Sequence, residues 1–308
     1  MATVLITGGT GLIGKALSKL LIEKGYDVII LSRDTKKVAA PGLQYAGWNI
    51  KEQNIDTNAV QQADCIIHLA GAGVADKRWS AKRKKEIVDS RTQSSALIIK
   101  ALKEHSNKVS VVVSMSGIGW YGADPMIPNK KPFVETDPAA ADFLGETCRL
   151  WEDSIAPVTS LGKRLAVFRT GIVLSNDGGA LKEFKRPLQF GVATVLGSGK
   201  QIVSWIHIDD LCRLLLQAIE DNSMTGVYNA VSPAPVSNKE LTLQLAKQKR
   251  GNFFLPVHVP AFALKLALGE MSIEVLKSAT VSAEKIRKQG FVFLYPSLQA
   301  ALGKLVPR

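Results

Sequence analysis

Short runs of apolar residues alternate with amphipathic stretches along the first half of the chain. The apolar runs occupy residues 4–6, 28–31, 64–71, 109–114 and 165–168. The stretches between them have the character of helices, most clearly over 95–103 and 142–155. Near-continuous apolar strands separated by helices are typical of a parallel sheet that is covered on both faces. The pattern therefore predicts an α/β fold built on a doubly wound parallel sheet.

The first apolar run leads directly into a glycine-rich turn. Residues 7–14 are Thr-Gly-Gly-Thr-Gly-Leu-Ile-Gly, and a helix-like stretch and a second apolar run follow. The spacing assigns a tight turn to Gly8, close backbone approach to a phosphate to Gly11, and close helix–strand packing to Gly14. The following helix would point its unpaired N–H groups and positive dipole end at a pyrophosphate. This arrangement predicts a dinucleotide site of the Rossmann type.

The end of the second run indicates which dinucleotide is bound. An Asp or Glu at this point binds the ribose hydroxyl of NAD, whereas an Arg accommodates the additional phosphate of NADP. The chain has Ser32 and Arg33 here, followed by Lys36 and Lys37, although Asp34 opposes them in charge. We therefore expect NADP(H) rather than NAD as the cofactor. The alternative is that Arg33 is an ordinary solvated loop residue.

The chain changes character near residue 171, where turn-rich segments begin. The predicted units are an NADP-binding Rossmann domain over 1–175, whose core continues in 200–230, mixed substrate-side segments over 176–254, and a small helical region over 255–308. With 46% hydrophobic residues, the chain can bury a substantial core.

Several properties of the sequence restrict its partners and its location. No apolar run reaches membrane-spanning length, and the chain enters a strand at once, so we expect no membrane partner and no secretory signal. Cys65, Cys148 and Cys212 are widely spaced and match no metal-ligand pattern. We expect buried free thiols, no metal site and a cytoplasmic location.

The chain carries a net charge of +12, much of it within residues 76–85. Such a cluster attracts anionic ligands or nucleic acid, or it is simply the solvated face of a helix. No nucleic-acid-binding motif accompanies it, so we expect no nucleic-acid partner.

Taken together, the motifs resemble the extended short-chain dehydrogenase/reductase superfamily. The resemblance lies in the glycine motif and in residues 68–71 and 205–210. Residues 75–79, 90–91, 119–122, 169–174 and 197–199 resemble, more closely, one atypical branch called the epimerase family. Its members are described as NADP-dependent oxidoreductases or nucleotide-sugar epimerases. The resemblance covers nearly the whole chain, including the small helical region from about residue 255.

The resemblance implies a set of cofactor contacts. The pyrophosphate would lie against Gly8, Thr10, Gly11, Leu12, Ile13 and Gly14, and the 2′-phosphate against Ser32 and Arg33. Leu69, Ala70 and Gly71 would line the adenine and ribose side, Ser114 would lie at the end of a central strand, and Val173 would reach the nicotinamide end. Glu86 and Arg91 match positions that face the cofactor, although both could equally be surface charges.

The chain departs from the superfamily at the catalytic residues. The superfamily uses a Tyr to transfer a proton and a Lys four residues later to lower its pKa, but here Phe143 and Thr147 occupy that spacing. Phe cannot exchange a proton, and Thr carries no positive charge. By resemblance, Ser116 would bind the substrate oxygen. Tyr121 is the nearest substitute proton donor, unless it is a structural loop aromatic.

Other polar residues are also candidates for the proton-transfer role. Asp142 and Glu146 share one helix face and could supply a carboxylate, although such residues are more often solvent-facing. His207 is expected to have a structural role at a strand end, before a helix capped by Asp209 or Asp210.

We expect an oxidoreductase that moves a hydride between NADP(H) and a small carbonyl or hydroxyl compound. A cofactor-binding sensor or scaffold without chemistry is the first alternative, because the Tyr–Lys pair is missing. A nucleotide-sugar epimerase is the second. The resemblance also implies a homodimer.

Overall fold

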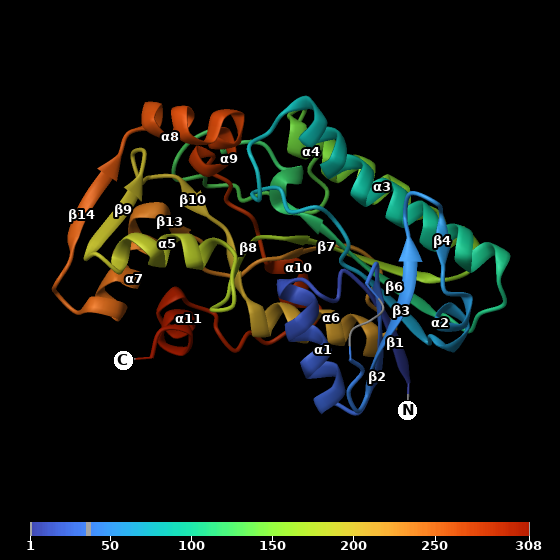
Figure 1. Ribbon diagram of the computed structural model, residues 1–308. Coiled ribbons are helices and arrows are strands. Elements are labelled where there is room, and N and C mark those ends of the chain that lie inside the picture. The colour runs from blue at the N-terminus through green and yellow to red at the C-terminus, as the bar shows by residue number, and fades with distance from the viewer. Residues whose placement is uncertain (1, 35–37, 308) are drawn as a thin grey trace.

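An eight-stranded sheet forms the centre of the computed structural model, which describes residues 2–34 and 38–307 (Figure 1). Its strands run in the order β12-β7-β6-β5-β1-β2-β3-β4, and every neighbouring pair is parallel except β3 and β4. The strands are β1 (Thr3–Thr7), β2 (Asp27–Ser32), β3 (Leu43–Asn49), β4 (Asn54–Ile55), β5 (Cys65–His68), β6 (Val111–Gly117), β7 (Arg164–Thr170) and β12 (Gly226–Ala230). The predicted parallel sheet is confirmed.

Helices cover both faces of this sheet. One face carries α1 (Leu12–Glu23) and α6 (Ile208–Glu220), and the other carries α2 (Thr57–Gln62), α3 (Ala81–Glu104) and α4 (Phe143–Ile155). Alternate residues of β1 enter the two cores, because side chains of a strand point to opposite faces. Val4 and Ile6 pack with Leu17, whereas Leu5 packs with Leu97. The sheet is therefore doubly wound, as the apolar runs predicted.

Most of the remaining elements form a smaller region with its own core beyond the carboxyl ends of the strands (Figure 1). Three two-stranded pairs join β8 (Ile172–Leu174) to β11 (Trp205–His207), β10 (Ile202–Val203) to β13 (Val236–Ser237), and β9 (Val192–Leu196) to β14 (Leu255–Val259). The helices of this region are α5 (Ala180–Leu188), α7 (Asn238–Arg250), α8 (Ala261–Leu268), α9 (Ser272–Leu276) and α11 (Leu298–Leu305), whereas α10 (Glu284–Lys288) packs against β12 of the large sheet. Short 3₁₀ turns are η1 (Ile118–Trp120), η2 (Ala156–Leu161) and η3 (Gly269–Met271).

The region from residue 255 is not helical throughout, because it begins with β14. Val257 and Val259 favour an extended backbone, and Pro256 and Pro260 disfavour helix at the residues that precede them. The parallel pairing with β9 satisfies one edge of this strand. The sequence pattern alone did not reveal that partner, which lies about sixty residues away along the chain.

At two glycines of the first turn, a side chain would clash with backbone atoms. Gly8 has φ +70°, and a Cβ placed on it would lie 2.8 Å from the carbonyl carbon of Leu69. A Cβ on Gly14 would lie 2.4 Å from the Cα of Gly9. The turn after β1 therefore packs backbone against backbone, both on the β5 side and beneath α1. Glycine is required here by space and, at Gly8, also by conformation.

Gly14→Ala should lower the free energy of unfolding by roughly 1–3 kcal/mol, because the added methyl overpacks a rigid backbone contact. Gly303→Ala is the matched control, since Gly303 lies in α11 and nothing lies within 4 Å of its Cβ position. The control should be neutral, or stabilising by up to about 1 kcal/mol. Urea denaturation of the two variants checks this, and equal stability of both would contradict the packing described.

Candidate functional site

The carboxyl ends of β1 and β5 are joined through one threonine. The Thr7 hydroxyl oxygen accepts hydrogen bonds from the N–H groups of Leu69 and Ala70, each at 3.2 Å. Its own proton is directed to Nδ1 of His68 at 2.7 Å. The opposite ring nitrogen of His68 lies 3.1 Å from the Ser95 hydroxyl, which donates to the carbonyl of Arg91. These bonds fix the backbone of Leu69 and Ala70 beside the glycine turn.

This network requires a neutral imidazole. Burial lowers the pKa of His68 to about 3, and the positive charge of Arg91 acts in the same direction. Because Nδ1 accepts from Thr7, the proton of the neutral ring belongs on Nε2, where it donates to Ser95.

The N-terminus of α1 faces the same edge of the sheet. Its N-cap is Gly11, which offers no side-chain hydrogen bond, and its first turn contains no acidic residue. The N–H groups of Leu12, Ile13 and Gly14 consequently have no intrahelical acceptor. Such a helix end is suited to an anion.

Val173 of β8 approaches the glycine turn from the smaller region. A Cβ at Gly179 would lie 3.3 Å from Cδ2 of Leu12 and 3.6 Å from the carbonyl oxygen of Val173. The first turn of α1 and the end of β8 are therefore neighbours. The structure thus brings Leu12 and Val173, both expected to contact the cofactor, to one edge.

A hollow of about 490 Å³ lies beyond the end of β2. Its lining includes Ser32, Arg33, Trp48 and Asp56. Arg33 is exposed and forms no ion pair with any residue in the described part of the chain. Lys36 and Lys37, which the sequence analysis grouped with it, lie outside the described residues.

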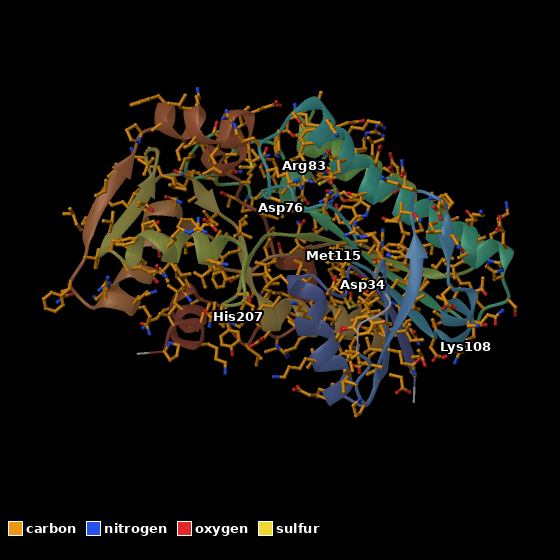
Figure 2. All side chains as sticks on the ribbon, in the orientation of Figure 1. Asp34, Asp76, Arg83, Lys108, Met115 and His207 are labelled. Carbon is orange, nitrogen blue, oxygen red and sulfur yellow. The ribbon has the colours of Figure 1, made fainter. Side chains whose placement is uncertain are left out.

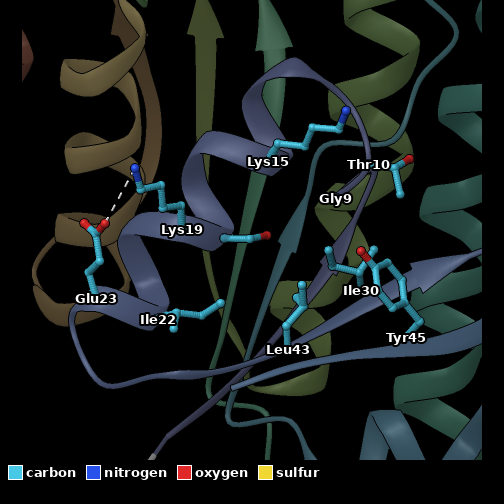
Figure 3. Close-up of a pocket in the computed structure, with 10 residues that line it drawn as sticks. Gly9, Thr10, Lys15, Lys19, Ile22, Glu23, Ile30, Leu43 and Tyr45 are labelled. Atoms are coloured by element: carbon cyan, nitrogen blue, oxygen red, sulfur yellow. Dashed lines mark ion pairs between the residues drawn. The ribbon is translucent and has the colours of Figure 1, made fainter. Parts of the chain in front are cut away.

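A second hollow, of about 350 Å³, lies between α1 and the strands β2 and β3 (Figure 3). Thr10 and Lys15 stand at its rim, and Ile30, Leu43 and Tyr45 form its apolar side. Gly9 also lines it and has no room for a side chain, since a Cβ there would lie 2.7 Å from Ile30. The first hollow thus lies at the end of β2, whereas the second runs along α1 as far as Glu23.

Arg91 lies against the loop that follows β5. Its guanidinium carbon would be 3.1 Å from a Cβ on Gly71, and Nη1 donates to the carbonyls of Ala72 and Ile87 at 3.0 and 2.8 Å. The ring of Trp151 is 4.8 Å away. Burial lowers the pKa of Arg91 to about 10, so the group stays charged at neutral pH. Within residues 2–34 and 38–307 it has no carboxylate partner.

Glu86 does not accompany Arg91. Its carboxylate is exposed and pairs with Nη1 of Arg83 at 2.7 Å. Both residues were expected at the cofactor, but only Arg91 contacts the loop after β5, through Gly71 and Ala72.

Ser116 ends β6 beside a buried ion pair. Its hydroxyl donates to Oε1 of Glu152 at 2.7 Å, and Arg169 binds both oxygens of that carboxylate, at 2.8 and 2.9 Å. The Arg169 guanidinium also lies 3.5 Å from the centre of the Trp120 ring. Ser114, two residues earlier, is fully buried within the strand. Glu152 and Arg169 were not predicted, although a charged residue at the end of the apolar run 165–168 was an available signal.

Tyr121 has a structural position that does not fit the proton-donor role considered from the sequence. Its side chain is fully buried and stacks on Phe133. Its hydroxyl donates to Oδ1 of Asn229 at 2.7 Å and accepts from Nη1 of Arg169 at 3.2 Å. Burial raises the pKa of Tyr121 to about 12 despite that arginine. The alternative, a structural loop aromatic, fits these contacts.

The positions of the missing Tyr–Lys pair hold structural side chains. Phe143 packs edge-on against Trp79, with ring centres 4.8 Å apart, and Thr147 donates to the carbonyl of Phe143. Asp142 caps α4 by accepting from Gly145, and Glu146 pairs with Arg149. Neither carboxylate is therefore a free base.

His207 has a structural role, as expected, but in a different form. The residue that caps α6 is His207 itself, whose Nδ1 accepts from the N–H of Asp209 at 3.1 Å. Asp210 is instead buried and accepts from the N–H groups of Leu294 and Tyr295. Asp210 thereby fastens the segment before α11 to α6.

The described residues contain no cluster of three or more His, Cys, Asp or Glu side chains suited to a metal ion. The three cysteines are buried free thiols. No helix in the described part of the chain is long and apolar enough to cross a membrane.

Comparison with known proteins identifies the family. The model of the NAD dependent epimerase/dehydratase family matches residues 4–142, and that of a domain of unknown function, DUF1731, matches 259–305. Epimerase family protein SSP1921 of Staphylococcus saprophyticus is 37% identical over 99% of this chain and all of its own. The chloroplastic SDR39U1 homolog of Arabidopsis thaliana is 34% identical over 97% of this chain and 85% of its own.

Solved structures agree with this assignment. Human epimerase family protein SDR39U1 (isoform 2), crystallised with NADPH, superimposes with a TM-score of 0.85 at 27% identity, over 99% of both chains. UDP-N-acetylglucosamine 4-epimerase from Bacillus cereus shares the fold, with a TM-score of 0.79 at 18% identity over 99% of this chain and 98% of its own. The fold is thus the NAD(P)-binding Rossmann type. The chain belongs to the epimerase family, in the branch that carries a DUF1731 region.

Tyr121→Phe should lower the free energy of unfolding by about 1–3 kcal/mol, because Asn229 and Arg169 each lose a buried hydrogen-bond partner. Tyr26→Phe is the control, since its hydroxyl bonds to Glu220 at an exposed position, and its effect should be below about 1 kcal/mol. Urea denaturation measures both. An unchanged stability of the Tyr121 variant would contradict the structural role.

Stability should also fall in mild acid. The pKa of His68 in the folded protein lies far below its unfolded value, so the unfolded state binds more protons at low pH. The stability that the neutral His68 ring contributes is therefore fully present above about pH 6.5. It is lost as the pH falls from there toward 3, by up to about 1.4 kcal/mol per pH unit. Denaturation at pH 7 and pH 5 should show a smaller difference for His68→Gln than for wild type. An equal difference would remove His68 as the cause.

Proposed function

We propose that the protein is an NADP(H)-dependent oxidoreductase of the extended short-chain dehydrogenase/reductase type that acts on an unidentified carbonyl or hydroxyl substrate. The observation that carries the proposal is the set of unpaired positive groups at one sheet edge. The uncapped N-terminus of α1 and Arg91, which is partly buried and has no carboxylate partner among the described residues, flank the loops after β1 and β5, and Arg33 is exposed after β2. A dinucleotide phosphate supplies the missing negative charge. The human relative crystallised with NADPH supports the choice of cofactor.

The residues fit this cofactor in order along the edge. Gly8 and Gly14 allow the close backbone packing that shapes the turn, and the pyrophosphate would lie against the backbone of Thr10, Gly11, Leu12 and Ile13. Ser32 and Arg33 would hold the 2′-phosphate, and Leu69, Ala70 and Gly71 would line the adenosine. Val173 would contact the nicotinamide end. When bound, the nicotinamide carries the hydride.

The groups that face the substrate would differ from those of the superfamily, because the Tyr–Lys pair is missing. Ser116 donates its only proton to Glu152, so its lone pairs remain for a substrate hydroxyl. Arg169 holds the Glu152 carboxylate in place on both oxygens. We assign Ser116 to orienting the substrate oxygen and Glu152 to positioning Ser116.

One observation favours a second function, a non-catalytic NADPH-binding sensor. Phe143 cannot exchange a proton, Thr147 carries no positive charge, and the Tyr121 hydroxyl lies in a buried hydrogen-bond network. Nucleotide-sugar epimerisation has less support, because it uses the same missing Tyr and the sugar epimerases compared here share only the fold. Oxidation of NADPH with any member of a carbonyl panel would distinguish the oxidoreductase from the sensor.

Arg33→Ala should weaken NADPH binding roughly 10- to 100-fold, because it removes a charge-assisted contact to the 2′-phosphate. NADH, which has no 2′-phosphate, should bind almost as before. Arg287→Ala, an exposed arginine on α10, is the control and should change neither affinity. Calorimetric titration measures all four combinations. Equal losses for NADPH and NADH in the Arg33 variant would reject the assignment.

A further inference from the structure

The smaller region exposes a strip of large apolar side chains, which we call the apolar strip. Phe190, Phe253 and Phe262 are 82%, 86% and 73% exposed, and Leu266 is 79% exposed. Leu255 and Val257 complete the strip. Single exposed apolar residues are ordinary, but a group of this size marks an interaction surface.

The members of the strip follow one another along the margin of the molecule. The N–H of Leu255 donates to the carbonyl of Gly191, which brings the loop of Phe190 beside the start of β14. Leu255 and Val257 share one face of that strand, and Phe262 and Leu266 share one face of α8. Figure 1 shows β14 as the outermost strand at the left, with α8 following at its upper end. Among the described residues β14 pairs only with β9.

The surroundings of the strip are positively charged. From Leu241 to Leu268 the chain contains no Asp or Glu but has Lys247, Lys249, Arg250 and Lys265. Lys185 of α5 adds to this positive charge. Burial lowers the pKa of Lys185, and repulsion by the nearby Lys249 cation lowers it further. Arg250 also binds the carbonyl of Leu188, so its cation lies beside the loop that carries Phe190.

We propose that the apolar strip docks the protein onto an anionic lipid surface. Exposed Phe and Leu side chains bordered by Lys and Arg are the chemistry that inserts at the boundary between headgroups and acyl chains. The sequence predicted no membrane partner because it lacks a spanning run, but surface docking requires none.

A second copy of this chain is a less favourable occupant. A two-fold interface would place each patch against itself. The cations around the strip would then meet like charges, with no acidic residue between 241 and 268 to neutralise them. An anionic bilayer instead offers a negative surface and an apolar interior together.

The test is flotation of the full-length protein with vesicles of phosphatidylglycerol and phosphatidylcholine in equal parts, and with vesicles of phosphatidylcholine alone. We expect binding to the anionic vesicles only, and its loss at high salt. Phe253→Ser combined with Phe262→Ser should weaken binding about tenfold. Val292→Ser, which removes a 72%-exposed apolar side chain outside the strip, is the control and should not.

Charge is tested separately. Lys249→Glu combined with Lys265→Glu should weaken binding at least about tenfold, given about 1 kcal/mol per charge near the surface. Lys51→Glu, an exposed lysine near the β3–β4 turn, should have little effect. All substitutions are at exposed sites, and unchanged melting temperatures will confirm folding.

Three results would overturn the proposal. The first is absence of binding to the anionic vesicles at low salt. The second is binding that both double variants retain. The third is a wild-type protein that is a dimer by light scattering and does not bind vesicles, together with a Phe253/Phe262 variant that is a monomer. This result would assign the strip to a second copy. The proposal does not rest on the proposed function, so NADPH binding and vesicle binding can fail independently.

Discussion

The close backbone packing at Gly8 and Gly14 is the constraint on which the rest of the site depends. Gly8 lies against the Leu69 carbonyl, and Gly14 lies over Gly9. This packing brings the end of β1, the start of α1 and the loop after β5 into one edge. The Thr7–His68 hydrogen bonds then hold the amides of Leu69 and Ala70 there. With a side chain at either glycine, the anion-binding helix end would be displaced from the strands that define it.

A second constraint comes from the buried pair of Glu152 and Arg169. The bidentate pair links α4 to β7, and it engages Ser116 on one side and Tyr121 on the other. Truncating one member of such a pair leaves an uncompensated charge in the interior. The Ser116 hydroxyl, which the proposed function assigns to the substrate oxygen, is therefore tied to the packing of α4 against β7. The helix that carries the Tyr and the Lys in the superfamily has Phe143 and Thr147 at those positions here, and it also supplies Glu152.

The sequence predicted the features that local rules determine. The strands follow from apolar runs, the turn from the glycine spacing, and the covered faces from alternation between strands and helices. The contacts that decide the role of Tyr121 are of another kind, because Asn229 lies 108 residues away and Arg169 lies 48 away. Strand β14 likewise depends on a distant partner, β9. Side-chain pairing across such distances is set by the folded topology, and no local pattern carries it.

The proposed function requires NADPH to bind at the sheet edge formed by the N-terminus of α1, Arg33 and Arg91. Calorimetric titration of the purified, cofactor-stripped protein with NADPH and with NADH tests it most directly. We predict tight binding of NADPH and a clear preference for NADPH over NADH, because Arg33 would contact the 2′-phosphate, which NADH lacks. Absence of binding to either dinucleotide would contradict it and would make the glycine turn a structural feature alone.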